Sequence, residues 1–135
     1  GDTVTLKSIM IDENIIEVFN DNTVNYIKFK INQSDFKWVS GSGSASFSGG
    51  LSGAMNPSFS YTDSVATLSF TDPYLASPTT RGSIVISGLQ IDPMSSANLG
   101  TVEVKVYGDN VTSEILPLLL VRTAAINSAG KWAFK

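Results

Sequence analysis

Apolar and polar residues alternate with a period of two along most of the chain, and helical spacing is hard to find. In Thr23–Ile31 apolar residues alternate with two lysines, and in Gly100–Gly108 three valines alternate with charged and aromatic residues. Alternation of this kind predicts β-strands with one buried face. The same criterion predicts further strands at Ile15–Phe19, Phe36–Trp38, Ser58–Tyr61, Val65–Phe70 and Ser113–Ala125. Only Pro93–Leu99 leaves room for a helical turn.

Two predicted strands change parity part-way along their length. In Thr3–Ile11 the valine and leucine at the start share one parity and the isoleucines at the end share the other, so a bulge or a switch between sheets is expected near Lys7-Ser8. Gly82–Asp92 slips in the same way at Ser87-Gly88, where a glycine suits a bulge. Pro117 has no N–H group, which places it at a sheet edge, at a bulge or at a crossing between sheets.

One segment is compositionally unusual. Eleven of the fourteen residues in Ser40–Gly53 are serine or glycine, which fits a mobile binding loop, a flexible hairpin or a poor edge strand. Within the segment Ala45 and Phe47 alternate with serines. This alternation favours a hairpin arm that lies on the body of the fold.

Eight or nine short strands, with turn signals about every ten residues, predict an all-β fold: a two-sheet antiparallel β-sandwich of immunoglobulin-like size. No strand is amphipathic enough to be stable alone, so the two sheets must share one core. Trp38 alternates with Phe36 and is expected to fill space between the sheets. The 135 residues fit a single module over 1–135. We expect it to be a piece of a larger protein, because no signal peptide begins the chain and Gly1 fits a residue left by tag removal.

Composition narrows the function by exclusion. The chain has no histidine and no cysteine, which excludes disulfides, thiolate zinc sites, Ser-His-Asp triads and most catalytic metal centres. A net charge of −3 with only two arginines argues against a nucleic-acid partner. The longest apolar run, Ile115–Val121, is interrupted by Pro117 and is too short to span a membrane. Charged residues make up 16 % of the chain, against 19 serines and 11 threonines, a composition common on secreted β modules.

Strand-shaped motifs carry a resemblance that covers most of the chain. They are Ile9-x-Ile11-x-Glu13-Asn14, Ile27-x-Phe29-x-Ile31, Phe36-x-Trp38, Gly82–Leu89 and Gly100–Gly108. Together they resemble β-sandwich repeat modules in large secreted surface proteins of Gram-positive, clostridia-like bacteria. Such proteins often also carry S-layer homology segments or a domain similar to the amino terminus of copper amine oxidases. The resemblance implies a spacer or adhesion module at the cell envelope without enzymatic activity, and it brings no catalytic signature.

Acidic residues are the first candidate chemistry, because several of them sit at predicted strand ends. Calcium prefers carboxylate and carbonyl oxygens that converge from loops, as the ends of a sandwich allow. The first calcium ligands to test are Asp12, Glu13, Asp72 and Asp109. The same residues are also ordinary turn formers, and no EF-hand spacing is present. We therefore expect no cofactor, with calcium as the exception to test.

Two enzymatic or covalent alternatives find little support. A glycosidase needs two carboxylates facing one another across a cleft, and nothing marks a pair among Glu13, Glu17, Glu103 and Glu114. An intramolecular isopeptide bond needs a buried lysine. Lys28, Lys30 and Lys105 lie on the polar parity of their strands, which predicts that they are not buried.

Aromatic side chains are the second candidate chemistry, since a flat ring can stack on a sugar. Tyr107 is the first candidate because its parity places it outside, and Tyr74 and Trp132 follow; Tyr26 and Tyr61 are further candidates. The leading expectation is a non-catalytic extracellular structural or adhesion module of a bacterial cell-surface protein. Its partners would be neighbouring modules of the same polypeptide. The alternative is a carbohydrate-binding module for cell-wall or plant polysaccharide.

Overall fold

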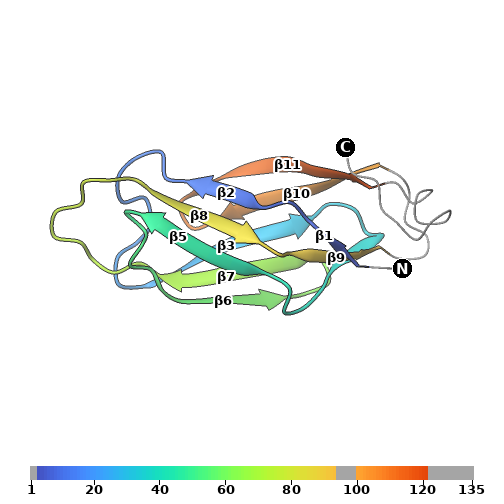
Figure 1. Cartoon of the computed structure of the whole chain (residues 1–135), viewed down its shortest axis with the longest axis horizontal. Helices are drawn as coiled ribbons and strands as arrows, with labels where there is room; N and C mark the ends of the chain where they lie inside the picture. Colours follow the sequence, from blue (N-terminus) through green and yellow to red (C-terminus); the bar gives the residue numbers. More distant parts are fainter. Residues whose placement is uncertain (1–2, 94–99, 122–135) are drawn as a thin grey trace.

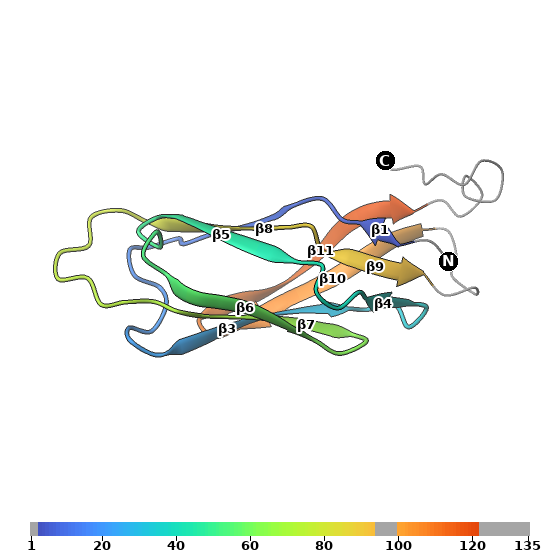
Figure 2. The same cartoon turned by 60° about the horizontal axis from the view of Figure 1, so that its bottom comes forward.

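A computed structural model describes residues 3–93 and 100–121 of the chain. These residues form two packed layers of antiparallel β-strands, which can be followed in the two views of Figure 1 and Figure 2. Within the described ranges there is no helix, and so none that could cross a membrane. The predicted all-β sandwich is confirmed.

The first layer is a five-stranded sheet in the order β11-β10-β3-β7-β6. Its strands are β3 (Val24–Ile31), β6 (Met55–Tyr61), β7 (Val65–Thr71), β10 (Gly100–Gly108) and β11 (Val111–Val121). β3 is the central strand and pairs with β10 on one side and β7 on the other. The two segments whose alternation is most regular in the sequence, β3 and β10, therefore lie side by side.

The second layer consists of two three-stranded sheets, β1-β9-β4 and β2-β8-β5. Its strands are β1 (Val4–Thr5), β2 (Ile9–Asp12), β4 (Phe36–Trp38), β5 (Ser44–Gly49), β8 (Gly82–Ser87) and β9 (Gln90–Pro93). The chain runs from β1 directly into β2, from β4 into β5 and from β8 into β9 (Figure 1). The layer thus has three long strands, each broken once at a similar level.

Backbone hydrogen bonds continue across these breaks. Leu6 donates to the carbonyl of Leu89 (2.8 Å), and Val39 donates to the carbonyl of Gln90 (2.9 Å). Two of the breaks fall at the parity changes that the sequence predicts, and Gly88 at one of them has a φ of 75°. When each broken strand is counted once, the eleven strands of three sheets become eight strands in two layers. This agrees with the predicted count.

The core lies between the layers and is made of every second residue of the paired strands. The burial of β7 alternates regularly, with Ala66, Leu68 and Phe70 buried, as expected for a strand with one inward face. Trp38 on β4 is 4 % exposed. Its indole N–H donates to the carbonyls of Phe29 and Ser64, both at 3.1 Å. Trp38 therefore fills the core, as predicted, and also ties the second layer to the first.

One predicted strand, Ile15–Phe19, is wrong. The N–H of Val18 donates to the carboxylate of Glu13 (2.9 Å), and Glu17 has a φ of 59°. A segment whose amide is taken by a nearby side chain and whose backbone turns into the left-handed region cannot extend along a neighbouring strand. The segment is a loop that wraps around the Glu13 carboxylate.

The remaining expectations have mixed outcomes. Ser40–Gly53 contains the edge strand β5, with Ala45 and Phe47 half-buried against the core, so the edge strand is confirmed. The hairpin is wrong, because β5 pairs with β8 while the next strand, β6, pairs with β7 in the other layer. Pro117 lies on the edge strand β11 beside a register shift opposite Val102 and Glu103, as its missing N–H predicts. The helical turn expected in Pro93–Leu99 lies outside the described residues, except for Pro93 itself at the end of β9.

Trp38→Phe should test the link between the layers. The variant keeps an aromatic ring in the core but leaves the carbonyls of Phe29 and Ser64 without the indole donor, which should cost about 1–3 kcal/mol of unfolding free energy. Urea denaturation followed by circular dichroism measures the loss. Phe36→Leu, a core substitution on the same strand that removes no hydrogen bond, serves as the packing control. A Trp38→Phe variant as stable as the native chain would contradict this role.

Candidate functional site

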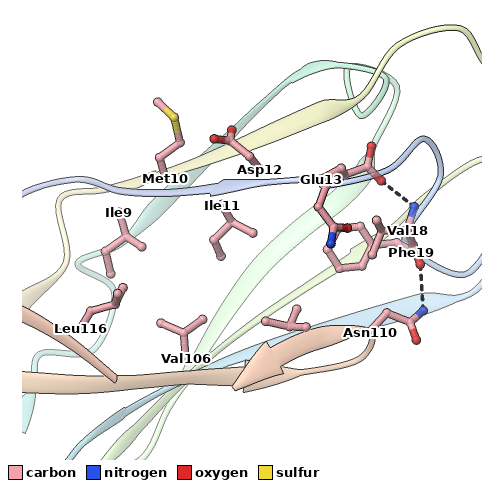
Figure 3. Close-up of a pocket in the computed structure, with 12 residues that line it drawn as sticks. Ile9, Met10, Ile11, Asp12, Glu13, Val18, Phe19, Val106, Asn110 and Leu116 are labelled. Atoms are coloured by element: carbon pink, nitrogen blue, oxygen red, sulfur yellow. Dashed lines mark hydrogen bonds between the residues drawn. The ribbon is translucent and has the colours of Figure 1, made fainter. Parts of the chain in front are cut away.

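A groove between the layers is the first candidate site. It runs between β2 on one side and the β10–β11 hairpin on the other, with a volume of about 260 Å³. Figure 3 shows Ile9 and Ile11 pointing into it from β2, with Val106 and Leu116 facing them from the opposite layer. Met10 and Asp12 alternate with the isoleucines and point away. The groove is therefore an apolar extension of the core that is open along one edge of the sandwich.

Glu13 closes one end of this groove and is only 5 % exposed. One carboxylate oxygen, Oε1, accepts the N–H of Gly82 (2.7 Å), and the other, Oε2, accepts the N–H of Val18 (2.9 Å). A carboxylate that accepts backbone N–H groups in this way is well compensated for its burial. Its chemistry is structural, since it joins the start of β8 to the loop after β2.

The turn between β10 and β11 fixes the same loop from the other layer. Asn110 has a φ of 57°, and its side-chain amide donates to the carbonyl of Val18 (2.9 Å) and to Oδ1 of Asn20 (3.2 Å). Val18 thus uses its N–H on Glu13 and its carbonyl on Asn110, as the dashed lines in Figure 3 show. The polar atoms at this end of the groove hold the fold together.

The four acids proposed for calcium lie at the end of the molecule that carries these loops, but they have different partners. Asp12 is exposed and accepts a hydrogen bond from the Ser83 hydroxyl. Asp109 accepts the N–H of Tyr26 through Oδ2 (3.0 Å). Among residues 3–93 and 100–121 no three acidic side chains are placed to share a metal ion. Calcium binding stays a prediction.

Asp72 is a buried acid at this end of the molecule. It is 4 % exposed, and burial raises the pKa of its carboxyl from 3.8 to about 6, helped by the negative charges of Asp21, Glu13 and Glu17. Burial and neighbouring like charge both disfavour the ionised form. Glu13 and Asp72 are therefore electrostatic neighbours, although each is held by its own element.

The outer face of the five-stranded sheet is the second candidate site. Tyr107 on β10 lies directly opposite Lys28 on β3, and Lys105 lies directly opposite Lys30. The Nζ atoms of Lys28 and Lys105 are 6.0 and 5.4 Å from the centroid of the Tyr107 ring. Two ammonium groups therefore lie near the ring of Tyr107, a residue that is paired with β3 on one side and lies at a register shift between β10 and β11 on the other.

The other aromatic candidates do not join this face as a group. Tyr74 is 60 % exposed in the loop after β7, where its N–H donates to Oδ1 of Asn22 (3.1 Å). Tyr61 is half-buried; its ring stacks on Phe59 and its hydroxyl accepts the N–H of Gly43 (2.9 Å). Trp132 lies outside the described residues. Tyr26, on β3 two residues before Lys28, is exposed on this sheet face, whereas Tyr107 is half-buried.

Several polar residues that organise the site region were not singled out from the sequence. Asn25 is fully buried; its side chain accepts the N–H of Asn20 (3.0 Å) and donates to the carbonyls of Asn20 and Thr23. The only local signal is a polar residue at an inward position of β3, on the same parity as Ile27. The role of Asn110 depends on a contact 92 residues away along the chain, which no local pattern reveals.

The comparisons with known proteins leave the site to be judged on its geometry alone. No protein-family model, no curated protein and no solved structure matches this chain. What the geometry offers is an apolar groove with a structural polar end, and an outward surface that combines an aromatic ring with cations.

Glu13→Gln should destabilise the fold by about 2–3 kcal/mol, because the amide supplies one good acceptor and turns an NH₂ group towards a second N–H donor. Asp12→Asn, at the adjacent exposed position, is the matched control and should change the unfolding free energy by less than about 0.5 kcal/mol. Chemical denaturation at pH 7 measures both. Equal effects of the two substitutions would show that the Glu13 hydrogen bonds do not hold the loop.

Asp72→Asn should stabilise the protein at neutral pH. The pKa of the Asp72 carboxyl is about 6 in the folded state and 3.8 in the unfolded state. Between these two pH values the folded state therefore keeps a proton on Asp72 that the unfolded state has released. The contribution of Asp72 to the free energy of unfolding is fully present below pH 3.8, and it is lost as the pH rises through 6. Because the asparagine amide mimics the protonated carboxyl, the variant should be about 1–2 kcal/mol more stable than the native chain at pH 7. This gain is smaller than the free energy that corresponds to the full pKa difference, because the charged neighbours are partly solvated.

Thermal melts of the native chain and the variant from pH 4 to pH 8 measure this difference. The gap between the two should close as the pH falls towards 4. Asp63→Asn, at an exposed acid in the turn between β6 and β7, should show no such pH-dependent gap. A constant difference between native chain and Asp72→Asn across this range would contradict the raised pKa.

Proposed function

We propose that this chain is a non-catalytic extracellular module of a bacterial cell-surface protein, with a structural and adhesive role. The observation that carries the proposal is the outer face of the five-stranded sheet, where the Nζ atoms of Lys28 and Lys105 lie 6.0 and 5.4 Å from the centre of the Tyr107 ring. The paired strands fix the backbone positions of the ring and the cations, so little backbone entropy is lost when this surface binds a partner. The resemblance of the strand motifs to envelope modules points to the same class of protein.

The arrangement of the first and last strands suits display. β1 starts and β11 ends at the same end of the sandwich, whereas the loop between β7 and β8 lies at the opposite end (Figure 1). In a longer polypeptide, a sandwich attached at one end would project from the line of the chain. Its sheet faces and its far loops would then be accessible to a partner outside the polypeptide.

The second candidate function is a carbohydrate-binding module. It is favoured by the outward position of Tyr107, whose strand partner Lys28 leaves the ring on the solvent side of the sheet. Aromatic rings supply a large contact area at low cost in side-chain entropy. Under this function the adhesive target would be a cell-wall or plant polysaccharide.

Retention on insoluble matrices should separate a binding module from a purely structural spacer. The native chain should be depleted from solution by at least one of cellulose, xylan and Gram-positive cell walls, and Tyr107→Ala should weaken that retention about tenfold through the lost aromatic contact. Tyr74→Ala removes an exposed tyrosine from the loop between β7 and β8. It is the matched control and should be retained like the native chain. Absence of retention on all three matrices would contradict the adhesive role.

A further inference from the structure

We propose that the outer face of the five-stranded sheet binds a linear acidic polysaccharide of the uronic-acid class. Tyr107 is the stacking platform, and Lys28, Lys30 and Lys105 pair with the carboxylates of the glycan. We call these four residues the cationic face. The inference rests on the adhesive function proposed above and names the chemical class of its ligand.

The first argument is an unfavourable arrangement of charge. Lys30 and Lys105 lie directly opposite one another on β3 and β10, and like charges at such cross-strand positions are destabilising. Within residues 3–93 and 100–121 neither of them, nor Lys28, forms a salt bridge with another described side chain. An anionic ligand would relieve this repulsion.

The second argument is the contrast between this face and the whole chain. The net charge of the protein is −3, yet three lysines gather on two adjacent strands. The one carboxylate among the described side chains of the five strands is Glu103, which is exposed on β10 two residues before Lys105. The cationic face is therefore a local positive surface on an acidic protein, and it complements a polyanion.

The third argument concerns the tyrosine. The two Nζ atoms lie 6.0 and 5.4 Å from the ring centroid, close to the outer limit for a cation–π interaction, where the attraction at an exposed site is weak. Lys28 and Lys105 can therefore turn from the ring to a ligand at little cost. In a uronic acid the carboxylate is carried by the same ring whose apolar face can stack, so one sugar residue can engage Tyr107 and a neighbouring ammonium group together.

The surface next to the cationic face suits a sugar chain. Thr67 and Ser69 on β7, with Ser58 and Ser60 on β6, continue the outer face away from β3. The hydroxyls of Ser58 and Ser69 are 3.0 Å apart and exposed. Hydroxyl groups can both donate and accept hydrogen bonds, which matches the hydroxyls of a polysaccharide. The described part of these five strands contains no arginine, so lysines supply the positive charge of this surface.

Affinity electrophoresis in gels containing polygalacturonate tests the inference, with neutral xylan as the comparison polymer. Polygalacturonate should retard the native chain at low salt more than xylan does, and the retardation should fall as salt rises. Lys28→Gln and Lys105→Gln should each weaken binding about fivefold, and Tyr107→Ala about tenfold. Lys7→Gln, which removes an exposed lysine from the other layer, is the charge-matched control and should bind like the native chain. Circular dichroism melts confirm that each variant is folded.

The outcomes separate this inference from the proposed function. Retention on neutral glycans that depends on Tyr107 but not on the lysines would leave the adhesive function in place and overturn the acidic ligand. Equal binding to polygalacturonate, to single-stranded DNA and to phosphatidylglycerol vesicles would identify a general polyanion surface and overturn it as well. Loss of binding to the same extent in Lys7→Gln would also overturn it. Binding to polygalacturonate without retention on any insoluble matrix would support the acidic ligand and contradict the surface-adhesion role.

Discussion

Two inner faces must stay in contact along the whole length of this sandwich, and the aligned breaks of the second layer make that contact possible. β-Strands twist, so side chains on a long unbroken strand drift away from the opposing layer. Here three neighbouring strands are interrupted at a similar level, and the parity of their inward residues is reset together. Leu6 and Leu89 are buried on one side of the break and Ile9 on the other, while Lys7 and Ser8 between them are exposed. The breaks thus let both halves of each strand contribute to one core.

The end of the sandwich that carries the loop between β7 and β8 needs polar groups to close it, because the chain there forms loops whose amides have no strand to pair with. Glu13 accepts two backbone amides, Asn25 accepts the amide of Asn20, and Asn110 donates to the carbonyl of Val18. The Glu13 carboxylate also has an electrostatic effect on a neighbouring acid. The charge of Glu13 is one cause of the raised pKa of Asp72. Glu13 therefore orders the loops and, after burial and the charge of Asp21, also contributes to the pH dependence of stability.

Local periodicity was sufficient to predict the paired strands and two of the breaks, but it could not predict contacts between distant segments. The alternation in Thr23–Ile31 reports burial on one face whatever the partner strand is, so β3 follows from it directly. Ile15–Phe19 has a similar apolar content and fails as a strand because Glu13, held by an amide 69 residues away at Gly82, captures the amide of Val18. Asn110 acts across 92 residues in the same way. Sequence parity also placed Tyr107 outward, whereas the pairing of Lys105 with Lys30 depends on the register between β3 and β10.

Glu13, Asn25 and Asn110 make hydrogen bonds that hold the loops, whereas the residues of the cationic face have no comparable role in the fold. Ile27, Phe29, Val104 and Val106, on the inward parity of the same two strands, are buried and hold β3 and β10 in the core. The outward positions between them carry no packing requirement, so a neutral or oppositely charged residue opposite Lys105 would serve the sheet better. Glu13 has two N–H partners for its charge, but Lys30 and Lys105 face one another. The pairing of Lys30 with Lys105 does not stabilise the sheet. Binding of a negatively charged ligand would explain why two lysines face one another there.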